Sequence, residues 1–284
     1  ANSTKLRQLI AQHHLLRMPC VYDGLTARLA QKAGFMALAT SGNAISASLL
    51  GVPDIGLLSM SENVQHSGHL IQALHVPLIC DVDTGYGGIM NAVRTVREFE
   101  AAGAAGIYME DQVFPPRCGA LPQDIAVVSM DEHCRKVEAA ANAKVNQDFM
   151  LIARTDAKSM HGLREAALRA KAYLQAGADA AMVIGADTPD ELMMVAEIVR
   201  GPLVSVIQEH PPSSELEDGL LRQVGCIVAM HSGVARYAIT KKLSEVFAIM
   251  HRDSSTGALR GEMCTQSEYN QVLGIDSWLS LDQQ

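Results

Sequence analysis

The chain has 284 residues, of which 48% are hydrophobic and 19% are charged, a composition typical of one large globular domain rather than a disordered chain. It has no run of about eighteen apolar residues to span a bilayer, and its start is too polar for a signal peptide. The formal net charge of -8 excludes a nucleic-acid surface, because binding phosphates requires clustered Lys and Arg. We therefore expect a cytoplasmic protein with neither membrane nor nucleic-acid partners.

Short apolar runs alternate with longer amphipathic stretches along the chain, which is the pattern of repeated βα units around a parallel sheet. The predicted strands are, in chain order, Pro19–Tyr22, Met36–Thr40, Pro77–Asp81, Gly106–Glu110, Met150–Arg154, Ala180–Ile184, Leu203–Ile207 and Cys226–Met230. Eight units in roughly 250 residues fit a (β/α)8 barrel of the TIM type, an α/β fold. A doubly wound open sheet is the alternative, but no GxGxxG follows the first predicted strand.

Start and stop signals for helices lie between these strands. Ser59 opens one predicted helix, Asn91 begins a second that runs to Ala102, and Ser129 precedes Glu132 in the spacing of a capping box. Glycines at 33–35, 101–106, 175–180 and 224–226 stand where a helix must stop before the next strand. This repetition supports the barrel.

The eighth unit ends near residue 255, so we expect a catalytic barrel domain over 1–255 and a C-terminal extension over 256–284. The extension contains the only tryptophan, Trp278. Two interpretations of the extension are open: it caps its own barrel, or it packs on a neighbouring subunit.

Polar residues follow the predicted strands at their carboxyl ends, where the reacting groups of a barrel enzyme lie. Asp81 and Asp83 form the sharpest pair, because two carboxylates at the end of a buried strand are costly unless a positive charge neutralises them. Oxygen ligands without nearby His or Cys favour Mg²⁺ or Mn²⁺ over zinc, and Glu110 can complete the outer shell. The alternative is that the two aspartates only cap a helix and a turn.

Five segments together resemble the isocitrate lyase and phosphoenolpyruvate mutase superfamily. They are YDGLTARLAQKAGF, TSGNAISASLLGVPD, CDVDTGYGG, GIYMEDQVFPPRCG and LIARTDA, in this order within roughly residues 5–250. The motifs are most similar to those of 2-methylisocitrate lyase-like and carboxyphosphonoenolpyruvate mutase-like members. The resemblance implies a cytosolic barrel enzyme that uses Mg²⁺, binds a small carboxylate substrate, and forms a homotetramer by swapping its last helix.

The resemblance also implies roles for individual residues. The residues of the metal site are Asp83 as the direct ligand, Asp81 and Glu110 through metal-bound waters, and Asp54 nearby. Backbone N–H groups of Ser41, Gly42 and Asn43, together with Asp81 and Arg154, would bind the substrate. Arg154 would stabilise the developing enolate oxygen, so that Cys118, Arg154 and Glu110 are the catalytic residues. Arg154 as a plain ion-pair partner of Glu110 is the alternative.

The loop after the fourth strand decides which reaction runs. Carbon–carbon lyases of this superfamily have Lys-Arg-Cys-Gly-His there, and the thiol exchanges a proton with the carbon of the leaving acid. This chain keeps Arg117 and Cys118 but has Pro116 in the Lys place and Ala120 in the His place. A thiol that begins protonated can still act as an acid. We therefore expect a Mg²⁺-dependent lyase that cleaves a 2-hydroxy or 2-keto carboxylate through a metal-bound enolate.

Further departures leave other functions open. Gly185 stands where the lyases have Glu, and either His210 or His231 replaces the lost base or is a hydrogen-bonded bystander. A decarboxylase and a phosphorus–carbon bond mutase or hydrolase need fewer proton-transfer groups. The third alternative is a ligand-binding member that has lost turnover.

Overall fold

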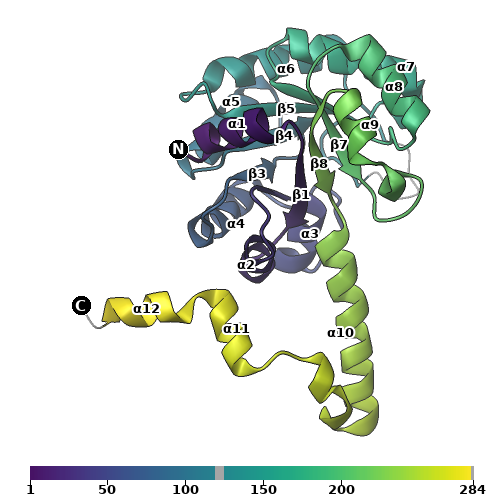
Figure 1. The fold of residues 1–284 in the computed structure, drawn as a ribbon. Coiled ribbons are helices and arrows are strands. Elements are labelled where there is room, and N and C mark those ends of the chain that lie inside the picture. Colours follow the sequence, from purple (N-terminus) through teal and green to yellow (C-terminus); the bar gives the residue numbers. More distant parts are fainter. Residues whose placement is uncertain (119–124, 283–284) are drawn as a thin grey trace.

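Eight parallel strands close on themselves in sequence order, and β8 pairs with β1 to complete the barrel (Figure 1). The computed structural model describes residues 1–118 and 125–282. The strands are β1 Leu16–Val21, β2 Leu38–Thr40, β3 Leu78–Asp81, β4 Gly106–Glu110, β5 Met150–Thr155, β6 Ala180–Val183, β7 Leu203–Ile207 and β8 Cys226–His231. The prediction of a (β/α)8 fold of the TIM type is confirmed.

Helices surround the barrel and connect its strands (Figure 1). The α-helices are α1 Asn2–His13, α2 Gly24–Lys32, α3 Gly42–Ile45, α4 Met60–Ala73, α5 Ile89–Ala101, α6 Met130–Ala143, α7 Lys158–Gln175, α8 Pro189–Val199, α9 Asp218–Gln223, α10 Val234–Asp253, α11 Gln266–Leu273 and α12 Ile275–Asp282. A π-helical turn η1 Ser46–Leu50 and the 3₁₀ turns η2 Ser213–Glu215 and η3 Gly257–Glu262 complete the set.

The predicted strand bounds hold closely, with one informative exception. The bounds of β4 and β7 are those predicted, whereas β1 begins at Leu16, three residues before the predicted start at Pro19. Arg17 interrupts the apolar run, so the pattern hid the start of the strand. Its guanidinium reaches out to Asp218, with Nη2 and Oδ1 2.6 Å apart.

Helix capping follows the predicted signals at two of three places. Ser59 and Ser129 accept the expected cap bonds at the starts of α4 and α6. The predicted start of α5 at Asn91 is wrong, because the helix begins at Ile89. Asn91 lies inside the first turn, where its Oδ1 accepts a hydrogen bond of 3.2 Å from the Gly88 N–H. Asn91 therefore stabilises the start of α5 from the third helical position, and the N-cap residue itself is Gly88.

The core has an inner and an outer layer. Met18, Ile79 and Ile152 belong to the cluster that fills the barrel, and Phe99 and Phe149 belong to the cluster between strands and helices. Because every strand runs in the same direction, all their carboxyl ends open at one end of this packed barrel. Side chains that are distant in sequence therefore meet there.

The helix α10 leaves the barrel after β8, and the chain then returns through α11, which contacts α2 on the outside of the barrel (Figure 1). No residue of α10 is buried. Only its start is anchored, where Ala235 and Ile239 pack against a cluster containing Tyr22 and Ile45. In the part of the chain that the structure describes, no helix combines the length and apolar character needed to cross a membrane.

A substitution of Gly106, at the start of β4, tests how closely β4 and β5 pack. A Cβ atom there would lie 2.5 Å from the Met150 backbone oxygen, so Gly106→Ala forces the two strands apart. We expect a loss of about 1–3 kcal/mol in the free energy of unfolding, as for other overpacked cores. Urea denaturation checks this, with Gly24→Ala as the control because no heavy atom lies within 4 Å of a Cβ there. Equal midpoints for the two variants would contradict the packing argument.

Candidate active site

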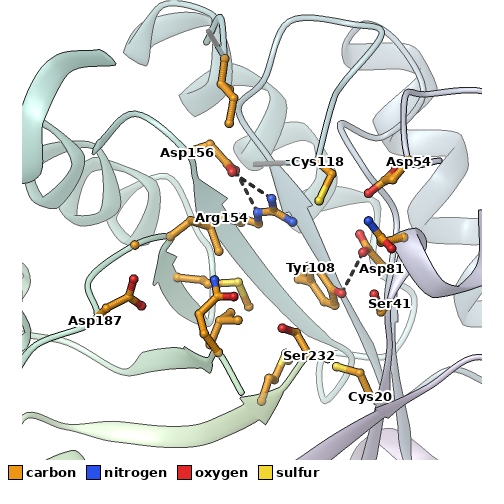
Figure 2. A pocket seen from close by; sticks show the side chains of 18 of the residues that line it. Cys20, Ser41, Asp54, Asp81, Tyr108, Cys118, Arg154, Asp156, Asp187 and Ser232 are labelled. Carbon is orange, nitrogen blue, oxygen red and sulfur yellow. Dashed lines mark hydrogen bonds and ion pairs between the residues drawn. The ribbon is translucent and has the colours of Figure 1, made fainter. Parts of the chain in front are cut away.

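A cavity of about 540 Å³ opens at the carboxyl ends of the strands. Figure 2 shows Asp81, Tyr108 and Arg154 facing into it from three neighbouring strands, with Cys118 near its rim. This volume lies in the range of small-molecule sites. The predicted site residues Ser41, Asn43 and Asp54 also line it.

Asp81 is held by three protein donors. One carboxylate oxygen, Oδ2, accepts hydrogen bonds from the Gly42 N–H at 2.7 Å and the Tyr108 hydroxyl at 2.8 Å. The other oxygen, Oδ1, accepts from the Asp83 N–H at 3.2 Å. The Gly42 N–H, which the resemblance assigned to substrate, is thus engaged with Asp81 in this structure.

Asp83 approaches the same point from a strained backbone. Its φ of 48° lies in the left-handed region that only Gly, Asn and Asp visit with ease. A Cβ atom on Gly42 would lie 3.0 Å from Asp81 Oδ2 and 3.1 Å from Asp83 Oδ1. Glycine at position 42 therefore allows both carboxylates to converge beside α3.

Burial and the nearby charges raise the pKa values of Asp83, Asp54 and Glu110. Burial, followed by the charges of Asp81 and Asp54, raises the pKa of Asp83 well above its usual value. Burial and the charge of Asp81 raise the pKa of Asp54 to about 6. Burial also raises the pKa of Glu110, although the charge of Arg154 opposes it. The cluster carries more negative charge than its neighbours neutralise.

Arg154 is the main cation against this cluster. Its Nη1 lies 2.9 Å from Glu110 Oε2, and its Nε and Nη2 each lie 2.8 Å from Asp156 oxygens. The ion pair with Glu110, which the sequence left as the alternative role of Arg154, is present. The sequence places Asp156 at the end of the fifth strand, like the other site residues, but the sequence analysis assigned it no role.

The loop carrying Cys118 is tied to the site through the backbone. The Cys118 N–H donates to the Asp54 carbonyl at 3.0 Å, and Gln112 binds both the N–H and the carbonyl of Arg117. Cys118 is partly exposed and lines the cavity. Ala120, which the sequence places where the lyases have His, lies outside the described residues.

Two further sequence predictions concern the other side of the cavity. At Gly185, the backbone oxygen accepts from Lys158 Nζ, which also lies 2.5 Å from Glu191 Oε1. His231 Nε2 lies 2.8 Å from Arg17 Nη1 and must accept there, since an arginine only donates. His231 is thus a hydrogen-bonded neighbour, whereas His210 lines the cavity.

Several groups of the cavity wall were not found from the sequence, and three of them are Tyr108, Arg236 and Tyr237. Tyr108 lies inside β4, and Arg236 and Tyr237 lie in the first turn of α10. A search restricted to strand ends cannot find a helix residue. The alternation of residues along β4 could have identified Tyr108, because every second side chain of a barrel strand points inward.

Comparison with known proteins gives the family. The family model of phosphoenolpyruvate phosphomutase matches residues 6–247. The chain belongs to this family. It is 35% identical over 274 residues to 2,3-dimethylmalate lyase of Eubacterium barkeri, covering 96% of this chain and 94% of that protein. The predictions of superfamily membership and of a lyase-type enzyme are thereby confirmed.

Solved structures of family members superpose over nearly the whole chain. Oxaloacetate acetylhydrolase in complex with 3,3-difluorooxalacetate has a TM-score of 0.92 and 30% identity, covering 99% of this chain and 96% of that one. Phosphonopyruvate hydrolase in complex with oxalate and Mg²⁺ has a TM-score of 0.89 and 30% identity, covering 100% of this chain and 99% of that one. The solved relatives therefore bind small carboxylates, one of them together with magnesium.

The acid cluster fits a magnesium ion of the open, hydrated kind. Among the described residues, no three His, Cys, Asp or Glu side chains converge closely enough to form a preassembled metal cage. Mg²⁺ usually keeps several waters and takes only one or two protein carboxylates, so a full cage is not required. Burial, followed by the charges of neighbouring aspartates, raises the pKa values of Asp83 and Asp54, and a divalent cation would neutralise these buried charges.

Metal binding should show in thermal stability and depend on pH. The raised carboxyl pKa values mean that the folded, metal-free protein binds more protons than the unfolded chain, so its stability falls as pH rises towards and through about 6, the pKa of Asp54. Mg²⁺ needs ionised ligands. We expect it to raise Tm by roughly 5–10 °C at a concentration about 100-fold above Kd near pH 8, and by much less near pH 5.

Asp83→Asn provides the matched variant. Asparagine tolerates the left-handed backbone and removes one charge from the cluster, so metal-free Tm near pH 8 should rise while the Mg²⁺-induced shift disappears. Glu98→Gln, at an exposed acid of α5, is the control and should keep the full shift. A Mg²⁺ shift that survives Asp83→Asn would remove this residue from the metal site.

Proposed function

We propose that this chain is a Mg²⁺-dependent lyase that cleaves a carbon–carbon bond in a small 2-hydroxy or 2-keto carboxylate. The observation that favours this reaction is the Cys118 thiol, which lines the cavity on a loop whose backbone is bonded to Asp54. A thiol beside a carboxylate-rich pocket supplies a proton donor for carbon. The 35% identical relative named as a 2,3-dimethylmalate lyase supports the same reaction class.

The acid cluster holds the metal in this proposal. Asp83 would be the direct ligand, Asp81 and Glu110 would hold its waters, and Asp54 would lie beside it. When bound, Mg²⁺, or Mn²⁺ in its place, supplies a Lewis acid that polarises substrate oxygens. The hydrogen bonds from Gly42 and Tyr108 orient the Asp81 carboxylate for this role.

The protein's own groups then bind and polarise the substrate. The backbone N–H groups of Ser41 and Asn43, two residues that line the cavity, would receive a substrate carboxylate, whereas the Gly42 N–H donates to Asp81 in this structure. Arg154, fixed side-on by Asp156 and from the other edge by Glu110, presents a rigid positive charge. Such a preorganised charge stabilises an oxygen as it becomes negative, without reorganisation at the moment of reaction.

Cys118 completes the cleavage. A carboxylate of the acid cluster would take the proton of the 2-hydroxyl group of a 2-hydroxy acid. The carbon–oxygen double bond then forms, the carbon–carbon bond breaks, and the electron pair of the broken bond moves to the carbon of the departing acid. That carbon takes a proton from Cys118 Sγ. The products are a 2-keto acid and a second carboxylic acid, and the barrel end excludes bulk water from the reacting carbon.

Cys118→Ser tests this step. We expect a fall of about 100-fold or more in kcat for carbon–carbon cleavage, the usual contribution of a general acid, with unchanged binding of oxalate. Cys264→Ser, at an exposed thiol of the extension, is the control. Release of keto acid from the substrate measures activity, and undiminished release by Cys118→Ser would remove the thiol from the mechanism.

A substrate screen separates the alternative functions. The panel consists of 2-hydroxy and 2-keto di- and tricarboxylates with Mg²⁺. Keto acid plus a second acid indicates the lyase. Carbon dioxide with one keto acid indicates a decarboxylase, and cleavage of a phosphonate indicates phosphorus–carbon chemistry. Pro116, Ala120 and Gly185, which stand in place of usual lyase residues, favour both of these alternatives. Metal-dependent binding without turnover on any member would support a ligand-binding protein.

We further propose a cytoplasmic homotetramer in which the barrel domain 1–255 exchanges its last helix with a neighbour and the extension 256–284 packs there. The exposed apolar side chains Leu243, Phe247 and Met250 on α10 support this, since they contact little of their own barrel. Light scattering should give four chains, and Phe247→Glu with Met250→Glu should give fewer. A monomer at micromolar concentration would exclude helix exchange.

A further inference from the structure

Asp111, the residue that follows β4, is a fully buried carboxylate that faces α7. Its Oδ2 accepts hydrogen bonds of 2.7 Å from the hydroxyls of Thr155 and Tyr173, and one of 3.3 Å from Arg169 Nη1. Its Oδ1 accepts from the Asp156 N–H at 3.0 Å. A buried charge is tolerated when it is paired and hydrogen-bonded, so these four donors hold the carboxylate in one place.

Asp111 holds three consecutive residues at the end of β5. Its backbone N–H donates to the Arg154 carbonyl at 3.2 Å, while its carboxylate accepts from the Thr155 hydroxyl and the Asp156 N–H. Successive side chains of an extended chain point to opposite faces. Thr155 accordingly points outward to Asp111, whereas Arg154 and Asp156 line the cavity.

Asp156 transmits this position to Arg154. Its two carboxylate oxygens each lie 2.8 Å from a guanidinium nitrogen, Nε or Nη2 (Figure 2). The Asp156 side chain is itself fully buried, so the place of its backbone sets the direction of the Arg154 guanidinium. A shift of about 1 Å in such a group can lower a rate about 100-fold.

Arg169 connects the same carboxylate to the segment that follows the Cys118 loop. Besides Asp111, its Nη1 reaches the Val128 carbonyl at 2.7 Å. The Val128 N–H donates to the Asp111 carbonyl at 2.9 Å. Ile125, three residues earlier, lines the cavity. The end of β5 and the returning segment are therefore held at one point against α7.

We propose that Asp111 is a positioning residue, which acts through Asp156 to align the Arg154 guanidinium with the oxygen that becomes negative in the reaction. The identity of that reaction rests on the proposed lyase function, whereas the effect of Asp111 on the placement of Arg154 does not. Loss of Asp111 should impair the transition state more than substrate binding, because a preorganised charge acts where charge develops.

Asp111→Asn tests the proposal. An amide has a single acceptor oxygen, which cannot serve both the Asp156 N–H and the donors at Oδ2. We expect kcat to fall by about 10–100-fold and KM to change by no more than about threefold. A crystal structure of the variant should show Arg154 Nε more than about 3.5 Å from the Asp156 carboxylate, beyond a hydrogen bond.

A double-mutant cycle with Asp156→Asn measures whether Asp111 acts through Asp156. If it does, Asp111→Asn should change kcat by no more than about threefold once Asp156→Asn is present. Leu6→Ala is the matched control, a cavity in the core at α1, whose Arg7 bonds to the Asp148 carbonyl ahead of β5. It should lower Tm, leave kcat within about twofold, and combine additively in free energy with Asp156→Asn.

Tyr173→Phe is the milder variant, for use if Asp111→Asn does not fold. It removes one hydroxyl donor from the Asp111 carboxylate, on α7 rather than at the cavity. We expect kcat to fall by roughly three- to tenfold, the contribution of one hydrogen bond, with KM nearly unchanged.

The outcomes decide between a positioning role and a purely structural one. An unchanged kcat in the folded variant, an unmoved Arg154 in its crystal structure, or a full effect of Asp111→Asn on top of Asp156→Asn overturns the proposal. If the wild type cleaves no acid of the panel, the lyase function fails and the crystal structure of the folded variant decides alone. A displaced Arg154 then supports the role of Asp111, and an unmoved one overturns it.

Discussion

The crowding of carboxylates at the ends of β3 and β4 is the constraint on which the rest of this site depends. Asp81, Asp83 and Glu110 are all at least nine-tenths buried, and each would repel the others if ionised without compensation. The fold compensates in part, with donors from Gly42 and Tyr108 and with the charge of Arg154. The negative charge that remains uncompensated favours the binding of a small divalent cation.

This constraint also explains the local backbone. A Cβ atom at position 42 would lie 3.0 and 3.1 Å from two carboxylate oxygens, so any side chain there would have to push the carboxylates of Asp81 and Asp83 aside. Asp83 takes a left-handed conformation that turns the chain sharply after β3, where an extended residue would carry its carboxylate away from Asp81. Strain of this kind persists where surrounding contacts enforce it, and it is characteristic of functional sites.

Much of the fold follows from local sequence patterns. The eight apolar runs predict the eight strands because the strands of a barrel are buried on both faces and read as continuous hydrophobic segments. The exception, β1, is hidden by Arg17, whose long side chain crosses the strand's edge to reach Asp218 and His231. The residue type alone does not show in which direction a long side chain places its charged group.

The sequence predicted those site residues that are polar and also stand at the end of a strand, and it did not predict the others. Asp81, Asp83, Glu110 and Arg154 all stand at strand ends, so topology alone brings them together. Arg236 does not, because it becomes part of the cavity only through the angle at which α10 leaves β8. At the start of α10, Ala235 and Ile239 pack against Tyr22, Ala44, Ile45 and Leu58, contacts between distant parts of the chain that no local pattern encodes.

The departure of α10 from the barrel gives this helix two surroundings (Figure 1). Its first turn forms part of the cavity wall, while the rest of this 20-residue helix, which is about 30 Å long in all, projects beyond the barrel body. A helix is stiff over such a length. A partner chain bound to the far end of α10 would therefore also act on the position of Tyr237 in the cavity wall. In this way chain association and the shape of the cavity are mechanically linked.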